Sequence, residues 1–209
     1  MKFMRILIIT LVLIFNLQSW TKADTNSISD FEIEGMSIGD SLLDYFEEIV
    51  IKADLKKYKN PYKNDDFRVV GLDWNLKKNY ELNTKVYDVY RFHVKKGDSK
   101  YKIYHIGGKI IYWKKDFKKC IKQKDEVANQ LEKLFGSDKR EEGKLKNHSY
   151  DKTGNSKTIS TYFRLSDGTI RIICYNWSEE IIKSEGWIDS LQVVIYSDEF
   201  LTWLNNEAY

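Results

Sequence analysis

Apolar side chains recur at intervals of three and four residues in two long segments, the spacing of amphipathic helices. The first segment begins at Ser37, which is expected to cap a helix because Asp40 follows three positions later, and it continues with a break to about Lys57. The second segment, 116–135, has the stronger pattern and ends at Gly136, a residue type that is common after helices. The expected apolar stripes are Leu42, Leu43, Phe46 and Ile49 in the first helix, and Cys120, Ile121, Val127, Leu131 and Leu134 in the second.

Alternating apolar and polar residues, separated by turn residues, predict antiparallel strands. The expected strands are 66–74, 86–94, 101–106, 109–113, 158–165, 169–175 and 187–196. Tight turns are expected at Lys96-Gly97-Asp98, Gly107-Gly108 and Ser166-Asp167-Gly168. The polar segment 137–157 is expected to be a long loop, and Ser178 and Ser197 are expected to cap two short helices.

Both halves of the chain therefore show a helical pattern followed by a meander of strands. This order predicts an α+β fold in which antiparallel meander sheets are covered by helices. The chain is either two tandem helix-plus-three-strand modules, 24–115 and 116–209, or one domain in which the two parts share a core. A unit of about 90 residues is marginally stable alone, so two units that share a core are the more stable arrangement.

The first residues have the layout of an export signal. Lys2 and Arg5 precede an apolar run, 6–15, and a polar stretch then leads to Ala23. This layout predicts a signal peptide, 1–23, that is cleaved after Ala23. The apolar run has about half of the roughly 20 residues that a membrane-spanning helix needs, so no stable membrane span is expected after cleavage. The mature chain is expected to be a soluble periplasmic or secreted protein.

The three basic residues of the leader account for the whole net charge of +3, so the mature chain is expected to be neutral. A nucleic-acid-binding protein needs an excess of basic residues, and no nucleic-acid partner is therefore expected. Lysines are nevertheless concentrated between Lys95 and Lys124, while the segment from Asp24 to Glu48 contains only acidic charges. The lysine-rich segment is either a solvated surface or a patch that attracts an anionic partner.

Cys120 and Cys174 are the only two cysteines of the chain. An even number of cysteines in an exported protein predicts a disulfide, whereas in the cytosol the same residues would be two buried thiols. The bridge would join the second long helix to the end of an apolar strand. No histidine has metal-ligand spacing with either cysteine, so no metal site is expected, and no cofactor motif occurs.

Four aromatic residues are candidates for a binding surface. Trp113 and Trp177 are the tryptophans expected to be most exposed, where their rings would stack on a sugar or a peptide. His93 and His105 lie on neighbouring predicted strands and are expected to come close together. They are either exposed or half-buried residues of the sheet, or a titratable pair that responds to periplasmic pH.

No hydrolase, phosphate-binding or dinucleotide-binding motif occurs in the sequence. We therefore expect a non-catalytic binding protein whose partner is an unknown protein or a small anionic or saccharide ligand. The alternative is a hydrolase of envelope polymers. Its catalytic groups would be carboxylates, among them Asp73, Glu81 and Asp88, or the loop His148-Ser149-Tyr150-Asp151.

The segment FEIEGMSIGDSLLDYF, 31–46, resembles the start of an uncharacterised family of small exported proteins from AT-rich marine alphaproteobacteria. The resemblance continues through Tyr90-Arg91-Phe92-His93, the helix start at Cys120, Asp167-Gly168 and Cys174-Tyr175-Asn176-Trp177. It implies a Gram-negative periplasmic setting and no known activity. The opening is also similar to small modules of outer-membrane assembly lipoproteins, whose lipid-bearing cysteine this chain lacks, and of tandem-repeat enzyme inhibitors.

Overall fold

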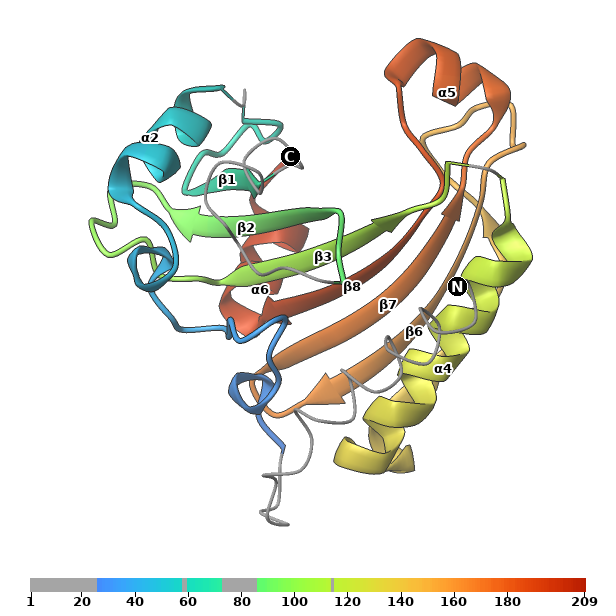
Figure 1. Ribbon diagram of the computed structural model, residues 1–209, viewed down its shortest axis with the longest axis horizontal. Helices are drawn as coiled ribbons and strands as arrows, with labels where there is room; N and C mark the ends of the chain where they lie inside the picture. The colour runs from blue at the N-terminus through green and yellow to red at the C-terminus, as the bar shows by residue number, and fades with distance from the viewer. Residues whose placement is uncertain (1–25, 58–59, 73–85, 114) are drawn as a thin grey trace, which may run out of the picture.

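The computed structural model describes residues 26–57, 60–72, 86–113 and 115–209, and these form an α+β structure, as the sequence predicts (Figure 1). The strands are β1 (Phe67–Leu72), β2 (Val89–Lys95), β3 (His105–Ile111), β4 (Arg140–Glu142), β5 (Lys146–Asn147), β6 (Lys157–Leu165), β7 (Gly168–Asn176) and β8 (Ser190–Ser197). All eight belong to one antiparallel sheet in the order β1-β2-β3-β8-β7-β6-β4, with β5 also paired to β6. The expected signal peptide lies outside the described residues.

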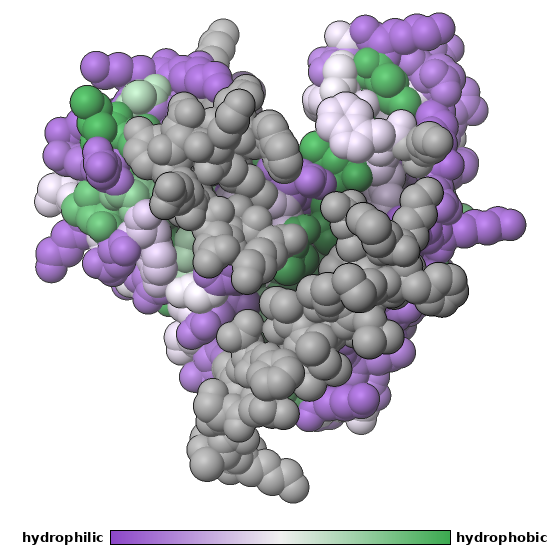
Figure 2. Space-filling view, viewed as in Figure 1, coloured by the Kyte–Doolittle hydropathy of each residue, from purple (hydrophilic) through white to green (hydrophobic). Residues whose placement is uncertain are grey.

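The described part of the chain contains four α-helices. They are α2 (Glu48–Lys57), α4 (Phe117–Phe135), α5 (Glu179–Glu185) and α6 (Asp198–Asn206), and three 3-10 turns are η1 (Ile28–Asp30), η2 (Leu42–Asp44) and η3 (Ser137–Lys139). In Figure 1, α4 lies across β6 and β7, and α6 lies behind the sheet. Figure 2 shows a notch between the part that contains α2 and the part that contains α5, both mainly hydrophilic on this side.

The two halves meet where β3 pairs with β8, so the meander of each half is part of one continuous sheet. The main buried cluster contains residues from both halves, including Phe92 and Phe163. The strands of 24–115 and of 116–209 therefore share a core. That the two halves arose by duplication stays a prediction.

The two faces of the sheet have different coverings, because side chains alternate between the faces along each strand. A row of fully buried residues crosses the face that α4, η1 and η2 cover: Phe92, Ile106, Ile195, Ile170 and Phe163. We call this side the core face. The opposite side, the α6 face, packs against α6 through a second cluster that includes Phe67, Phe200 and Trp203.

The disulfide expected from the sequence is present as a cysteine pair at bonding distance. Cys120 in α4 and Cys174 in β7 have an S–S distance of 2.04 Å, and both side chains are buried. The pair closes a loop with a sequence separation of 54 residues. It fixes the N-terminal part of α4 to the core face.

The second long helix begins as predicted, after Asp116, whose side chain accepts a hydrogen bond from the backbone N–H of Lys119. Its buried positions are Cys120, Lys124, Ala128, Leu131 and Phe135, whereas Ile121, Val127 and Leu134 are only partly buried. The predicted stripe is therefore rotated, because a lysine occupies its centre. Lys124 donates a hydrogen bond to Thr161 Oγ1 at 2.6 Å and pairs with the carboxylates of Asp125 and Glu142.

The start of the first predicted helix is wrong. Asp40 does accept a hydrogen bond from the N–H of Ser37 at 2.8 Å, but Gly39 has a φ of 99°, which a helix does not allow. The α-helix begins only at Glu48, after the 3-10 turn η2. Because of this shift, Ile49 is 70% exposed and does not belong to an apolar stripe.

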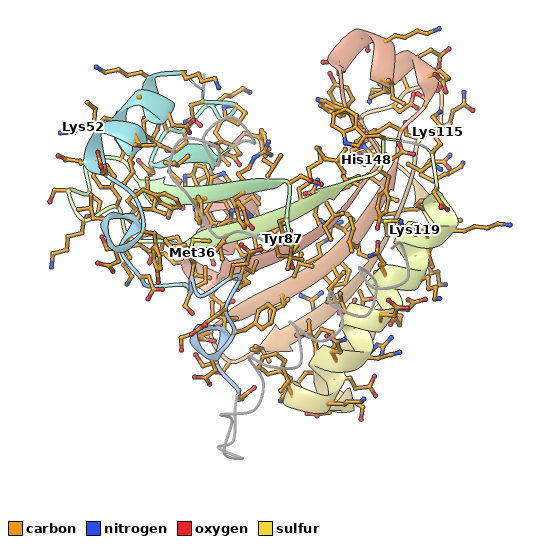
Figure 3. The ribbon with its side chains drawn as sticks, in the orientation of Figure 1. Met36, Lys52, Tyr87, Lys115, Lys119 and His148 are labelled. Carbon is orange, nitrogen blue, oxygen red and sulfur yellow. A yellow bond between two sulfur atoms is a disulfide. The ribbon has the colours of Figure 1, made fainter. Side chains whose placement is uncertain are left out.

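The turn predicted at Gly107-Gly108 is also wrong, because both glycines lie inside β3. A Cβ atom on Gly108 would lie 2.6 Å from the ring of Tyr87, which is labelled in Figure 3. A Cβ atom on Gly107 would lie 3.3 Å from Val194 Cγ1. These glycines permit close packing on each face of the sheet and do not form a bend.

Several local predictions for the second half are confirmed. The hairpin of β6 and β7 turns at 166–167, and Ser178 and Ser197 cap α5 and α6 through their side chains. Two other predictions differ from the structure. The expected loop, 137–157, contains β4 and β5, and the last strand, expected from 187, begins at Ser190. In the described residues, no helix has the length and apolar character needed to cross a membrane.

Candidate functional site

Two arginines from distant parts of the sequence lie in one row on the α6 face. The row consists of Arg91, Gly107, Val194, Arg171 and Tyr162, on β2, β3, β8, β7 and β6. Three strand spacings, about 14 Å, separate the backbones of the two arginines. Arg91 is exposed and Arg171 is partly exposed. Lys109, two residues after Gly107 on β3, faces the same side, and we call Arg91, Lys109 and Arg171 the cationic patch.

The arginines of this patch differ from the other described arginines in their partners. Arg68 pairs with Asp65, Arg140 with Glu132 and Glu142, and Arg164 with Glu141. No described carboxylate forms an ion pair with Arg91 or Arg171. The guanidinium of Arg171 donates instead to Ser160 Oγ at 3.1 Å and lies over the ring of Tyr162. Arg91 and Arg171 therefore present positive charge that no described carboxylate neutralises through an ion pair.

The charges of the patch act on their neighbours. Burial and the adjacent Arg91 lower the pKa of Lys109, with Asp88 acting in the opposite direction. Burial raises the pKa of Tyr196 to about 12, and Arg171 opposes this shift. Like charges held close together are unfavourable without a counter-charge, so an anion bound here would stabilise the patch.

The sequence contains a local signal for this site. Arg91 and Arg171 are single charged residues inside otherwise apolar strand segments, YRFHV and TIRIIC. A charged residue in such a position marks a strand face that is not buried in the core. The convergence of the two residues could not be predicted, because it depends on the pairing of β3 with β8.

His93 and His105 are brought together as predicted, but they do not form an exposed surface. His93 Nδ1 lies 2.8 Å from His105 Nδ1, and His93 Nε2 lies 2.9 Å from the hydroxyl of Tyr62. The two histidines are 3% and 5% exposed, because the ring of Phe200 on α6 packs against both imidazoles. They belong to the packed layer beneath α6.

Trp177 is also buried, contrary to expectation, because it is the centre of an aromatic cluster. The cluster consists of His148, Tyr150, Tyr175, Trp177 and Trp187. Tyr175 stacks on Trp177 at a centroid distance of 5.2 Å, and the rings of His148 and Trp187 each lie 4.6 Å from that of Trp177. His148 lies near the base of α5 (Figure 3). Since Tyr175 follows Arg171 by four residues on β7, the cluster borders the cationic patch.

Trp113 is 79% exposed, as expected, but none of the ring contacts among the described residues includes it. It lies between β3 and α4. The four candidates, Trp113, Trp177, His93 and His105, are therefore not parts of a single binding surface.

The loop considered for catalysis is arranged as a structural turn. The carboxylate of Asp151 accepts hydrogen bonds from the backbone and side chains of Thr153 and Ser156, and not from His148. The hydroxyl of Ser156 lowers the pKa of Asp151 more than any other group. Burial lowers the pKa of His148, with Arg171 adding to the effect.

A surface cavity of about 530 Å³ lies between α6 and the β1–β2 edge. It is lined by Asp66, Phe67, Lys95, Lys96, Glu199, Thr202, Trp203 and Glu207. Glu199 pairs with Lys95, which raises the pKa of this lysine. Of the carboxylates considered from the sequence, Asp73 and Glu81 lie outside the described residues, and Asp88 accepts a hydrogen bond from the N–H of Ile111.

Among the residues that the structure describes, no group of three or more His, Cys, Asp or Glu is arranged to hold a metal ion. No protein-family model, curated protein or solved structure matches this chain, so the evidence for its role is the arrangement of its own residues.

Proposed function

We propose that this chain is an exported, non-catalytic binding protein of the bacterial periplasm. The signal-peptide pattern in 1–23 and the resemblance of 31–46 to exported proteins support this location. The Cys120–Cys174 pair is compatible with it, because structural disulfides persist in oxidising compartments. The mature protein would begin at Asp24.

Export is tested by fractionating native cells and mapping the protein under non-reducing conditions. We expect the osmotic-shock fraction to contain a chain that begins at Asp24 and yields a cross-linked Cys120–Cys174 peptide pair. A cytosolic chain that retains Met1 and has two free thiols would refute the location.

The cationic patch is the observation that carries the binding role. Two arginines without described carboxylate partners lie on a partly exposed sheet face, although three other arginines of the chain are paired. Guanidinium groups form bidentate hydrogen bonds with carboxylates and phosphates. The sheet brings both arginines to the same face, where each guanidinium could bind an anionic group of a partner.

Chromatography on a carboxymethyl matrix tests this role. Wild type, R91Q/R171Q and K118Q/K122Q would be eluted with salt at pH 7.5. Lys118 and Lys122 are exposed on α4, on the opposite side of the sheet, and their replacement changes the net charge equally. We expect R91Q/R171Q to elute at clearly lower salt than K118Q/K122Q. Equal elution of the two variants would show that only net charge matters, and it would contradict a binding role for the patch.

The cavity beside α6 is the observation that favours the alternative, a hydrolase of envelope polymers, because three carboxylates line it. Its test is the release of soluble fragments from purified peptidoglycan by wild type and by D66N/E207Q. Release that the double variant lacks would support the hydrolase and displace the binding proposal.

A further inference from the structure

The shape of the surface indicates which class of partner the cationic patch binds. Small-molecule sites are usually concave and enclosed. Two surface cavities among the described residues are the one beside α6 and one lined by Asn129, Glu132, Lys133 and Ser137, and neither contains a residue of the patch. The patch lies on the sheet face itself, which is the kind of surface that a protein partner covers.

The residues around the patch have the composition of a protein interface. Arg, Tyr and Trp are the residues that contribute most to protein–protein binding energy. Here Arg91 and Arg171 are accompanied by the partly exposed rings of Tyr162, Tyr175 and Tyr196 on the same face. Tyr175 and Tyr196 already pack against Trp177 and Phe200, so Tyr162 is the tyrosine whose hydroxyl and ring a partner could contact.

The dimensions of the face fit a segment of polypeptide. Three strand spacings, about 14 Å, separate β2 from β7 on this face. Only Gly107 and Val194 separate the two arginines within their row. A loop or extended segment that crosses the strands could thus place one carboxylate on each guanidinium without a large side chain in between.

A membrane surface fits this face less well. Recognition of anionic lipids usually uses clusters of four to eight basic residues, whereas this patch has three. The patch is also bordered at one end by α6, which covers His93 and His105, and at the other by the aromatic cluster.

On the basis of the proposed binding role, we propose that the cationic patch binds an acidic segment of another protein. Arg91 and Arg171 each hold a carboxylate of that segment, and Lys109 adds positive charge between them. The ring of Tyr162, which lies beside Arg171, packs against the segment, and its hydroxyl donates a hydrogen bond.

A fluorescent ten-residue oligoglutamate peptide and phosphatidylglycerol vesicles are the two probes for this inference. Peptide binding would be measured by anisotropy in low salt, and vesicle binding by co-sedimentation, for the mature disulfide-bonded protein. The variants are R91Q/R171Q, R91K/R171K and the control K118Q/K122Q. A thermal unfolding curve for each variant would verify that it is folded.

We expect R91Q/R171Q to bind the peptide about tenfold or more weakly than K118Q/K122Q does. R91K/R171K should be intermediate, because lysine keeps the charge but loses the bidentate geometry. Vesicle binding that depends on the two arginines, without peptide binding, would overturn the acidic-segment inference and leave the binding role standing. If neither probe binds in a manner that depends on Arg91 and Arg171, both proposals fail.

Discussion

The ring of Tyr87 lies flat against Gly108, with the three nearest ring atoms 2.6 to 2.7 Å from the position that a Cβ atom would occupy. Tyr87 precedes β2, and Gly108 is in the middle of β3. The ring also packs edge-on against Tyr90, which is fully buried. This contact explains why a glycine occupies a central strand, where it is otherwise unfavourable.

G108A should therefore destabilise the fold by about 1–3 kcal/mol, because the added methyl group forces the Tyr87 ring out of its place. Urea unfolding of wild type, G108A, Y87A and the double variant measures this cost. The cost of G108A should be much smaller in the Y87A background. Equal costs in both backgrounds would show that the two residues do not interact.

Acidification should destabilise the protein through His93 and His105. Burial lowers the pKa of His105 to about 3, and burial, with His105 as a second cause, lowers the pKa of His93 well below its usual value. Both histidines are therefore neutral in the folded protein, while the unfolded chain binds protons below about pH 6.5. Stability is thus fully present above that pH and falls by about 1.4 kcal/mol per pH unit for each histidine below it.

The groups around this pair are the hydroxyl of Tyr62, the ring of Tyr196 and the charge of Arg91. Urea midpoints between pH 7.5 and 5.0 would be compared for wild type and H93F/H105F. The double variant should lose much less stability over this interval. If both proteins lose the same amount, the acid sensitivity has another origin.

Removal of the disulfide should lower the free energy of unfolding by about 4 kcal/mol for a loop of this length. Denaturation of C120S/C174S, compared with wild type under oxidising conditions, measures this. Adding a reductant should lower the free energy of unfolding of wild type to nearly that of the variant. It should leave the stability of the variant unchanged. A variant as stable as oxidised wild type would show that the two cysteines are not bridged.

Lys124 is 1% exposed and is held by Thr161 and by two partly exposed carboxylates. K124M keeps most of the apolar stem but leaves these groups without their cation, so it should cost about 1–3 kcal/mol. K122M, on the exposed side of the same helix, should change stability by less than about 0.5 kcal/mol. If K124M and K122M change the free energy of unfolding equally in chemical denaturation, the contacts of Lys124 contribute nothing measurable to stability.

Features that depend on neighbouring residues were predictable from the sequence. The caps of α5 and α6, the hairpin of β6 and β7, and the helix that carries Cys120 all follow from local patterns. Features that depend on contacts between residues far apart in the sequence were not predictable. The ring of Tyr87 occupies the space that a side chain at position 108 would need, and the buried Lys124 donates to Thr161 of β6.

In the candidate site, too, local features could be predicted and distant contacts could not. His93 and His105 could be placed together from the hairpin that joins their strands, but their burial depends on α6, more than ninety residues later in the chain. Arg91 and Arg171 lie in one row across the sheet only because β3 pairs with β8. Local sequence patterns predict which strand face a residue occupies, but they do not predict which strands become neighbours.

The most direct test of the cationic patch is a titration of the ¹⁵N-labelled mature protein with oligoglutamate peptide, followed by NMR. We predict that the largest shift changes occur at the amides of Arg91, Gly107, Val194 and Arg171, the row that joins β2, β3, β8 and β7. Changes concentrated instead on the exposed lysines of α4, with this row unaffected, would contradict the claim that the α6 face is the binding surface.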